Sequence, residues 1–546
     1  MLSIPDASME TPYSAYVPTA KSSTLFFNCR RDDGIDAFGV RAGRFAYPSG
    51  GFDREIDLGG AHLLPAFGDG HAHPLFAGRE LAGPKTTGLA DIDSIVEVVR
   101  AFAEANREKE WIVGGTYDRT LGENGTFDAA WLDAAVVDRP VILHASDHHT
   151  IWVNSEAMRR ANVTRTTPDC TTGIIERFAD GEPRGTFREW DATNLILSKV
   201  PSRSLADEID SLSQASRRMA AGGVTWWQDA WVDPGMAEIY LATSSAGKLI
   251  QDVDLAFRAD PNSWQEDFKY FIAMRDRIES SRLPNRITSR TIKFFTDGVI
   301  EGGTALLLEP YLDEPHSHGM PVWDRGELIR AATAADEAGF QLHVHAIGDG
   351  GVRLALDVIE NVISINPLRA RRPVIAHVQL IAEPDLARFA SLGVIANFTP
   401  VWTCLDREQD VLCTPRIGQS RSDHQYRMRS LIDSGAQISF GSDWPVSTPV
   451  PLEGLPTAVH RQNGRGDLSG GWLMHEALTL DEALAAYTTG VAFQAFCEDE
   501  WGSLAPGMEA NFLVLAQDLR QLPVEQISSL LIDATYLRGE AVFVRR

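Results

Sequence analysis

The sequence is poor in cysteine and has no paired cysteine motif. Five cysteines are spread over 546 residues without a CxxC pair, which argues against a disulfide framework or a cysteine zinc knuckle. The sequence also lacks any run of about 18 uncharged apolar residues. Its first residues, MLSIPDASMETPYSAYVPTAKSS, lack the basic and then apolar segments of a secretory signal. These absences predict a soluble protein of the cytoplasm.

Basic residues are fewer than acidic residues. Lys and Arg total 50 against 75 Asp and Glu, a formal net charge of −25. Nucleic acid and anionic membranes repel such a surface, so we expect neither as a partner. A small-molecule substrate fits better, and a homodimer is the simplest expectation for a soluble enzyme.

Two common hydrolase motifs are missing as well. No GxSxG appears, which excludes the usual serine-hydrolase elbow, and no HExxH appears, which excludes a zincin site.

What the sequence does contain is a regular alternation of apolar strand segments and helical segments. This pattern is typical of a parallel sheet with helical crossovers, and eight such units indicate an α/β fold built on a (β/α)8 TIM-type barrel. Catalytic groups in that fold lie at the carboxyl ends of the strands. The eight predicted strands are residues 62–70, 223–230, 253–260, 290–298, 340–349, 373–379, 393–399 and 436–445.

The rest of the chain is expected to form additions to this barrel. The stretch before the second strand is too long for one crossover and contains strand-like pieces of its own, WIVGGTYD and PVILHASD. Short strands with glycine turns occur near both ends and can pair into one small β-sandwich. The predicted parts are an N-terminal extension (1–22), a composite β-sandwich (23–61 and 502–546), the barrel (62–74 and 222–501) and a subdomain inserted over the barrel mouth (75–221).

The pair His71 and His73, in LLPAFGDGHAHPLF, is the most informative motif. Side chains at i and i+2 of an extended backbone point to the same face, so both imidazoles can converge on one cation. An isolated HxH can equally well decorate a turn. The polar residues on the other predicted strands therefore decide whether this pair binds a metal or only forms part of a turn.

Further candidate metal ligands lie on separate predicted strands. The further candidates are Lys293 in TIKFFTDG, His343 and His345 in LHVHAIGD, His377 in IAHVQ and Asp443 in FGSDWP. Each has a structural alternative: a hydrogen-bonded core histidine, an ion-paired lysine or an aspartate that ends a strand. A buried lysine can also escape its charge by reacting with carbon dioxide, because the resulting carbamate has two oxygens that can bridge metal ions.

This ordered set resembles the amidohydrolase superfamily, and within it the large metal-dependent hydrolases that include the N-substituted formamide deformylases (amidohydrolase family 3). The resemblance spans about residues 23–543. Besides the residues above, it rests on DHHTIWVNSEAM (147–158), TGIIER (172–177), GEPRGTFRE (181–189), IKFFTDGVIEGGTA (292–305), HVHAIGDGG (343–351), GSDWPV (441–446), AYTTGVA (486–492) and GSLAPGMEANFLVL (502–515).

The resemblance implies a centre of two divalent metal ions, preferably zinc. His71 and His73 would hold one ion, and His345 and His377 the second. Lys293, as a carbamate, would bridge both. Asp443 would contact the first ion and act as acid and base, which makes Asp443 and Lys293 the catalytic pair.

The chemistry expected is hydrolysis of a non-peptide or N-acyl carbon–nitrogen (amide) bond in a small molecule. Imidazole and carboxylate ligands suit zinc or manganese, and two cations can lower the pKa of a shared water to about 7, giving a metal-bridging hydroxide. Deamination or opening of a cyclic amide is the alternative reaction. A barrel homologue without catalysis is the alternative class, against which the full ligand set argues.

Several further residues are predicted to contact substrate. His149, Asn154 and Glu189 lie in motifs of the inserted segment and bind either the substrate or the barrel. Trp402 belongs to a loop from Thr399 to Arg427 that follows a strand directly and is placed to cap the pocket. The remaining candidates for substrate contact are Trp227, expected to line the pocket while Trp226 packs, and His343, expected behind the ligand His345.

Overall fold

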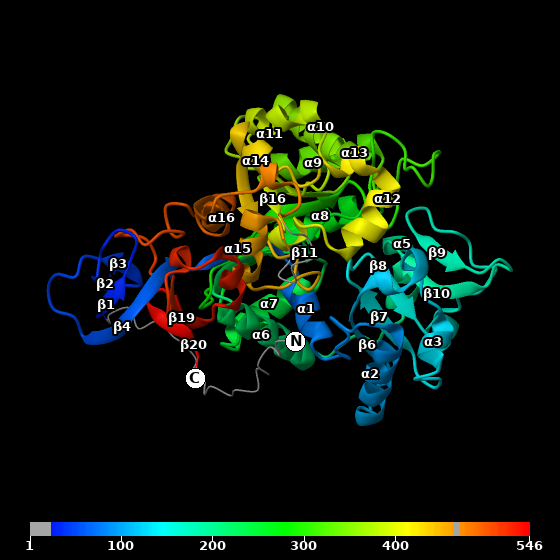
Figure 1. Ribbon diagram of the computed structural model, residues 1–546, viewed down its shortest axis with the longest axis horizontal. Helices are drawn as coiled ribbons and strands as arrows, with labels where there is room; N and C mark the ends of the chain where they lie inside the picture. The colour runs from blue at the N-terminus through cyan, green and yellow to red at the C-terminus, as the bar shows by residue number, and fades with distance from the viewer. Residues whose placement is uncertain (1–22, 463–469, 546) are drawn as a thin grey trace.

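Eight parallel strands form one nearly closed sheet at the centre of the molecule (Figure 1). The computed structural model describes residues 23–462 and 470–545, so the predicted extension 1–22 lies outside the described residues. The strands pair in the order β17-β16-β15-β14-β13-β12-β11-β5. All eight overlap the predicted segments, which confirms the barrel. They are β5 (Phe67–Ala72), β11 (Val224–Val232), β12 (Asp252–Arg258), β13 (Ile287–Phe295), β14 (Gln341–Ala346), β15 (Val374–His377), β16 (Ile395–Phe398) and β17 (Gln437–Phe440).

The first barrel strand begins later than the sequence suggested. Residues 62–65 end a different strand, β4 (Arg54–Pro65), which pairs antiparallel with β18 (Phe512–Leu515). Pro65 has no N–H to donate to a sheet, so a strand boundary at this point has a physical cause. Barrel pairing starts at Phe67, whose N–H donates to the Gly223 carbonyl.

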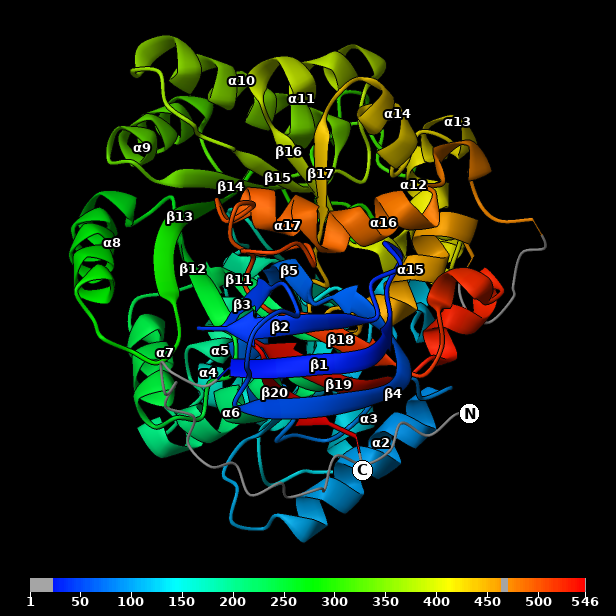
Figure 2. The same ribbon diagram turned by 90° about the vertical axis from the view of Figure 1, so that its left-hand side faces the viewer.

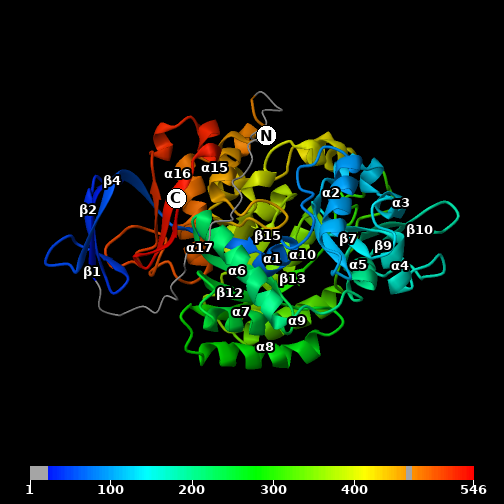
Figure 3. The ribbon, with the colours of Figure 1, turned by 90° about the horizontal axis from the view of Figure 1, so that it is seen from below.

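Helices surround this sheet on the outside (Figures 2 and 3). One of them, α11, ends at Gly393 in the left-handed region, as a C-cap glycine does. The helices around the barrel are α6 (Leu205–Ala221), α7 (Met236–Ser245), α8 (Trp264–Glu279), α9 (Arg325–Glu337), α10 (Asp349–Ile365), α11 (Leu386–Leu392), α14 (Met428–Asp433), α15 (Pro451–His460), α16 (Leu480–Tyr487) and α17 (Thr489–Gln494). None of the helices in the described ranges combines the length and apolar character needed to cross a membrane.

The segment between β5 and β11 forms a separate five-stranded sheet, drawn in cyan beside the barrel in Figure 1. Its strand order is β6-β7-β8-β10-β9, and both expected strand pieces are present, as β6 and β7. Its own buried apolar clusters support it on both sides. The elements are α1 (Pro74–Glu80), α2 (Ile92–Ala105), β6 (Ile112–Tyr117), α3 (Ala129–Asp133), β7 (Val141–Ala145), β8 (Thr150–Val153), α4 (Ser155–Ala161), β9 (Ile174–Arg177), β10 (Pro183–Arg188) and α5 (Trp190–Leu197).

Strands from both ends of the chain join one seven-stranded sheet on the opposite side of the barrel (Figure 3). Its order is β20-β19-β18-β4-β1-β2-β3, so the β4–β18 pair links the two ends. Its core includes Phe26 stacked on Phe38 and Phe512 stacked on Tyr536, and Phe26 meets Phe512 edge to face. The remaining strands are β1 (Ser23–Arg30), β2 (Ala37–Arg41), β3 (Arg44–Ala46), β19 (Ile532–Leu537) and β20 (Glu540–Val544).

Candidate metal centre

The two histidines of the HxH motif meet Asp443 at the carboxyl end of the barrel. His71 Nε2 lies 3.2 Å and His73 Nε2 lies 2.9 Å from the same oxygen, Asp443 Oδ1. The Asp443 N–H also donates to the His71 carbonyl at 2.7 Å. Gly441 permits this approach, because a Cβ there would lie 2.6 Å from the His71 backbone nitrogen. The first and last barrel strands are therefore joined at these residues.

The other three predicted ligands lie in the same space. Lys293 is fully buried near the end of β13, with Nζ 3.5 Å from His71 Nε2. The His377 ring centroid lies 4.8 Å from that of His71 and 4.7 Å from that of His345. All six side chains proposed as ligands thus converge from strands that are far apart in the sequence.

The nitrogen atoms of two histidines are disposed as metal ligands require. His71 Nδ1 is 2.8 Å from His343 Nε2, and His345 Nε2 is 3.2 Å from the Gly298 carbonyl oxygen. One nitrogen of each ring is thereby engaged outside the centre, so the other can present an electron pair. His377 Nδ1 is buried without a hydrogen-bond partner among the described residues. The donor set fits a zinc-type cation.

Burial and charge adjust the protonation of these groups. Burial lowers the pKa of His71, His345 and His377 well below the usual range, which keeps them in the neutral form that binds metal. Burial also lowers the pKa of Lys293 to about 7, although the Asp443 charge opposes this. The Lys293 amine is therefore partly neutral near neutral pH.

Asp443 behaves in the opposite way. Burial alone would raise its pKa, but the hydrogen bond from His73 and the charges of His73 and Lys293 lower the pKa to about 2. The carboxylate is therefore ionised and can accept a proton.

A cavity of about 300 Å³ opens at this centre. His345, His377 and Asp443 line one part of it, and the inserted segment contributes Ser146, Asp147 and His149. The loop 399–427 supplies another wall, as expected for a cap. Trp402 in this loop stacks on His377 with ring centroids 5.3 Å apart and planes at 16°.

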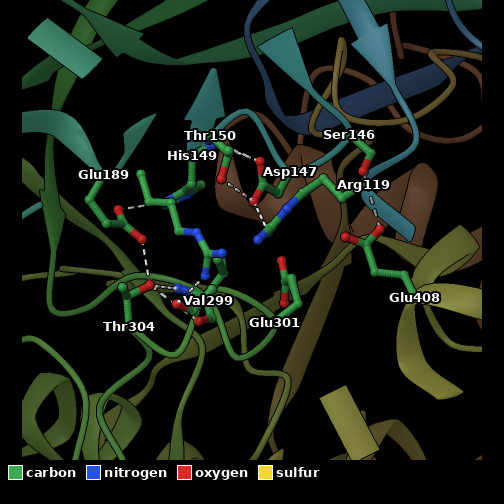
Figure 4. Close-up of polar contacts among 12 residues, drawn as sticks. Arg119, Ser146, Asp147, His149, Thr150, Glu189, Val299, Glu301, Thr304 and Glu408 are labelled. Carbon is green, nitrogen blue, oxygen red and sulfur yellow. Dashed lines mark hydrogen bonds and ion pairs between the residues drawn. The ribbon is translucent and has the colours of Figure 1, made fainter. Parts of the chain in front are cut away.

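His149 and Glu189 are coupled beside the cavity (Figure 4). His149 Nδ1 lies 2.8 Å from Glu189 Oε2, and the other Glu189 oxygen accepts the Thr304 hydroxyl. Burial lowers the pKa of His149, but the charge and hydrogen bond of Glu189 outweigh this and raise it to about 9. His149 therefore presents a protonated ring to the cavity, 5.4 Å from the His345 ring.

Two predicted substrate contacts are wrong because their side chains lie elsewhere. Trp227 is fully buried in the main core cluster of the barrel, and Trp226 packs against Trp501, so neither lines the cavity. His343 is fully buried between His71 and Gln228, with Nδ1 2.6 Å from Gln228 Oε1. It fixes the orientation of His71 instead of reaching substrate.

The prediction that Asn154 contacts substrate is also wrong, because backbone groups occupy both the oxygen and the nitrogen of its side-chain amide. Its Oδ1 accepts the N–H groups of Val141 and Ala157, and its Nδ2 donates to the carbonyls of Val136 and Arg139. The side chain is fully buried and caps α4. Asn154 therefore holds the inserted segment together.

This role makes a stability prediction for Asn154→Ala. The change leaves buried backbone groups without partners, and each such group costs about 1–3 kcal/mol. We expect the variant to unfold at lower temperature in a calorimetric scan, with unchanged KM for any substrate. A raised KM with unaltered thermal unfolding would restore Asn154 to the substrate site.

Several groups around the centre do not belong to the predicted set. Gln228 supports His343, and Asp297 accepts the N–H groups of Leu306, Ile347 and Gly348, so it orders the loops beside His345. A polar residue inside an apolar strand, GVTWWQDA, was the available signal for Gln228. Nothing local marked the cavity-lining acids Glu301 and Glu408, because distant loops bring them together.

Comparisons with known proteins come from sequence and from structure. A family model described as "Amidohydrolase family" matches residues 54–543. Protein LONG AFTER FAR-RED 3 of Arabidopsis thaliana is 29% identical over 90% of this chain and 83% of its own length. The N-substituted formamide deformylase of Arthrobacter pascens is 26% identical over 89% of each chain. An uncharacterized metal-dependent hydrolase from Pyrococcus horikoshii shares the fold, with a TM-score of 0.72 and 23% identity over 92% of this chain and 99% of its own.

Proposed function

The chain belongs to the amidohydrolase family, and we propose that it is a metal-dependent hydrolase of a carbon–nitrogen bond, other than a peptide bond, in a small molecule. The observation that carries this proposal is the convergence of His71, His73, Lys293, His345, His377 and Asp443 at one end of the barrel, beside a cavity. An N-acyl amide is the favoured substrate, and the name of the Arthrobacter relative makes N-formyl amides the first compounds to test.

We assign the metal ligands as follows. His71, His73 and Asp443 would hold one divalent cation, His345 and His377 the other, and Lys293 as a carbamate would serve both. Zinc suits this donor set. When bound, such cations polarise a carbonyl and lower the pKa of water to about 7.

The protein's own groups would then manage the protons and the substrate. Asp443, ionised by its surroundings, would accept a proton from the attacking water and return it to the departing nitrogen, because an amine leaves poorly unless protonated. His149, held by Glu189, would donate a hydrogen bond to the carbonyl oxygen as negative charge develops there. Trp402 would pack against the substrate from the loop side.

The proposal is tested by a substrate screen with metal-loaded and chelated protein. N-formyl, N-acyl, carbamate and cyclic amide compounds are compared, together with amino heterocycles that would reveal a deaminase. We expect about two divalent ions per chain and loss of hydrolysis after chelation, restored by zinc or manganese. Full activity in chelated protein would refute the metal-dependent mechanism, and inactivity of metal-loaded protein on every class would favour a non-catalytic homologue.

A further inference from the structure

One wall of the cavity carries carboxyl groups that have no cation of their own. Glu301 follows β13, and Asp406 and Glu408 belong to the loop 399–427. All three line the same cavity as His345, His377 and Asp443. We call Glu301, Asp406 and Glu408 the acidic wall. In Figure 4 Glu301 lies below the Arg119 head group, and the Glu408 carboxyl group lies to the right, beside Ser146.

Three cations near the acidic wall are paired with other carboxylates. Each has a carboxylate partner outside the wall: Arg119 with Asp147, Arg188 with Glu176 and His149 with Glu189. Arg119 also interacts electrostatically with Glu301 and Glu408. One guanidinium that is already paired cannot balance three further carboxyl groups, and burial raises the pKa of Glu301, Asp406 and Glu408, so a bound cation would stabilise their ionised forms.

Hydrogen bonding gives a second, independent indication of a ligand. Gln409, next to Glu408, lines the cavity with only 6% of its surface exposed, and its Oε1 has no donor among the described residues. Glu408 Oε1 is likewise buried without a donor. The Glu301 carboxylate receives a weak thiol contact, from Cys413 Sγ at 3.6 Å. Buried acceptors without donors are costly, so this wall suits a group that donates several hydrogen bonds.

We propose that the acidic wall binds a primary ammonium group of the substrate. The substrate would then be an amide whose acyl–nitrogen bond lies at the metal centre and whose other end carries the cation. This inference rests on the proposed function and adds the charge class of the substrate. An ammonium has three N–H donors and one positive charge, which match the acceptors and the charge of the wall. The indole face of Trp402 in the same cavity is also favourable to a cation.

A pair of compounds of equal length tests the proposal on the unaltered, metal-loaded protein. N-formyl-1,5-diaminopentane ends in an ammonium group, and N-formylhexylamine ends in a methyl group at the same position. We expect kcat/KM to be at least about tenfold higher for the ammonium compound, since hydrogen bonds to charged groups contribute about 1.5–3 kcal/mol. Equal or lower kcat/KM would overturn the inference, while hydrolysis of either compound would still support the proposed function.

Variants locate the effect on the wall. Glu301→Gln and Glu408→Gln should each lower the ratio of the two kcat/KM values by about fivefold or more. Asp410→Asn, an exposed change in the same loop, is the matched control and should leave the ratio unchanged. An unaltered ratio in both glutamine variants, with thermal unfolding like that of the parent, would overturn the assignment.

Binding provides a readout that does not need turnover. By titration calorimetry on the metal-loaded protein, hexylammonium should bind at least about tenfold more tightly than hexanol, and Glu408→Gln should remove the difference. Equal affinity would overturn the inference even if no amide is hydrolysed. A clear preference for the ammonium compound without hydrolysis of any amide would support ammonium binding by the acidic wall and refute the proposed reaction.

Discussion

Lys293→Ala is expected to lose bound metal and hydrolysis together, with turnover reduced on the order of a thousandfold. Lys293 is fully buried beside His71, and burial lowers its pKa to about 7. Its neutral amine can attack carbon dioxide, forming an N–C bond and releasing a proton, and the proposed carbamate would offer two oxygens to the centre. Alanine supplies none.

The measurement combines metal analysis with rescue. Formate or acetate should restore part of the metal content and activity, because a small carboxylate can enter the space left by the side chain. Lys248→Ala is the control, since Lys248 lies at the surface and pairs with Asp210 at 2.7 Å. Unchanged metal content and turnover in Lys293→Ala would show that Lys293 is only a structural residue.

Asp443→Asn should retain metal but lose hydrolysis by about 10²- to 10⁴-fold, the range typical of removed acid–base catalysis. Asparagine keeps the size of the side chain and the backbone N–H that donates to the His71 carbonyl. It cannot take up and return a proton at neutral pH. The loss should therefore fall on kcat, with KM little altered.

Metal analysis and steady-state kinetics on the same preparation separate the two effects. Asp423→Asn, an exposed change in the loop 399–427, should behave like the parent. A kcat for Asp443→Asn close to that of the parent would remove Asp443 from proton transfer, and an empty centre would show that its main task is to hold metal.

The barrel and the residues of its centre were predictable because each strand carries its own signal. Apolar runs end in His, Lys or Asp, and a parallel barrel brings all carboxyl ends to one face. His343 and His345 show the limit of this argument. Alternation places both on one face, but it does not give depth, and His343 lies behind His71 while His345 borders the cavity.

Trp227 shows a different limit. Alternation predicts that Trp226 and Trp227 face opposite sides of β11. Both sides of a barrel strand are apolar, so the pattern does not show which side chain, if either, lines the cavity. For Asn154 the sequence supported two interpretations. Its motif suggested a substrate contact, but an Asn before Ser-Glu in WVNSEAM also predicts a helix N-cap. The acidic wall depends on loops that are distant in sequence, and no local pattern could assemble it.

The bond between the Asp443 N–H and the His71 carbonyl has a consequence for biosynthesis. Asp443 follows β17, the last strand of the barrel, and His71 lies in β5, the first. During synthesis, His71 and His73 therefore leave the ribosome long before Asp443, which completes the predicted ligand set. The centre can form only after most of the chain has been made, so fragments that end before β17 should be unable to acquire metal during synthesis.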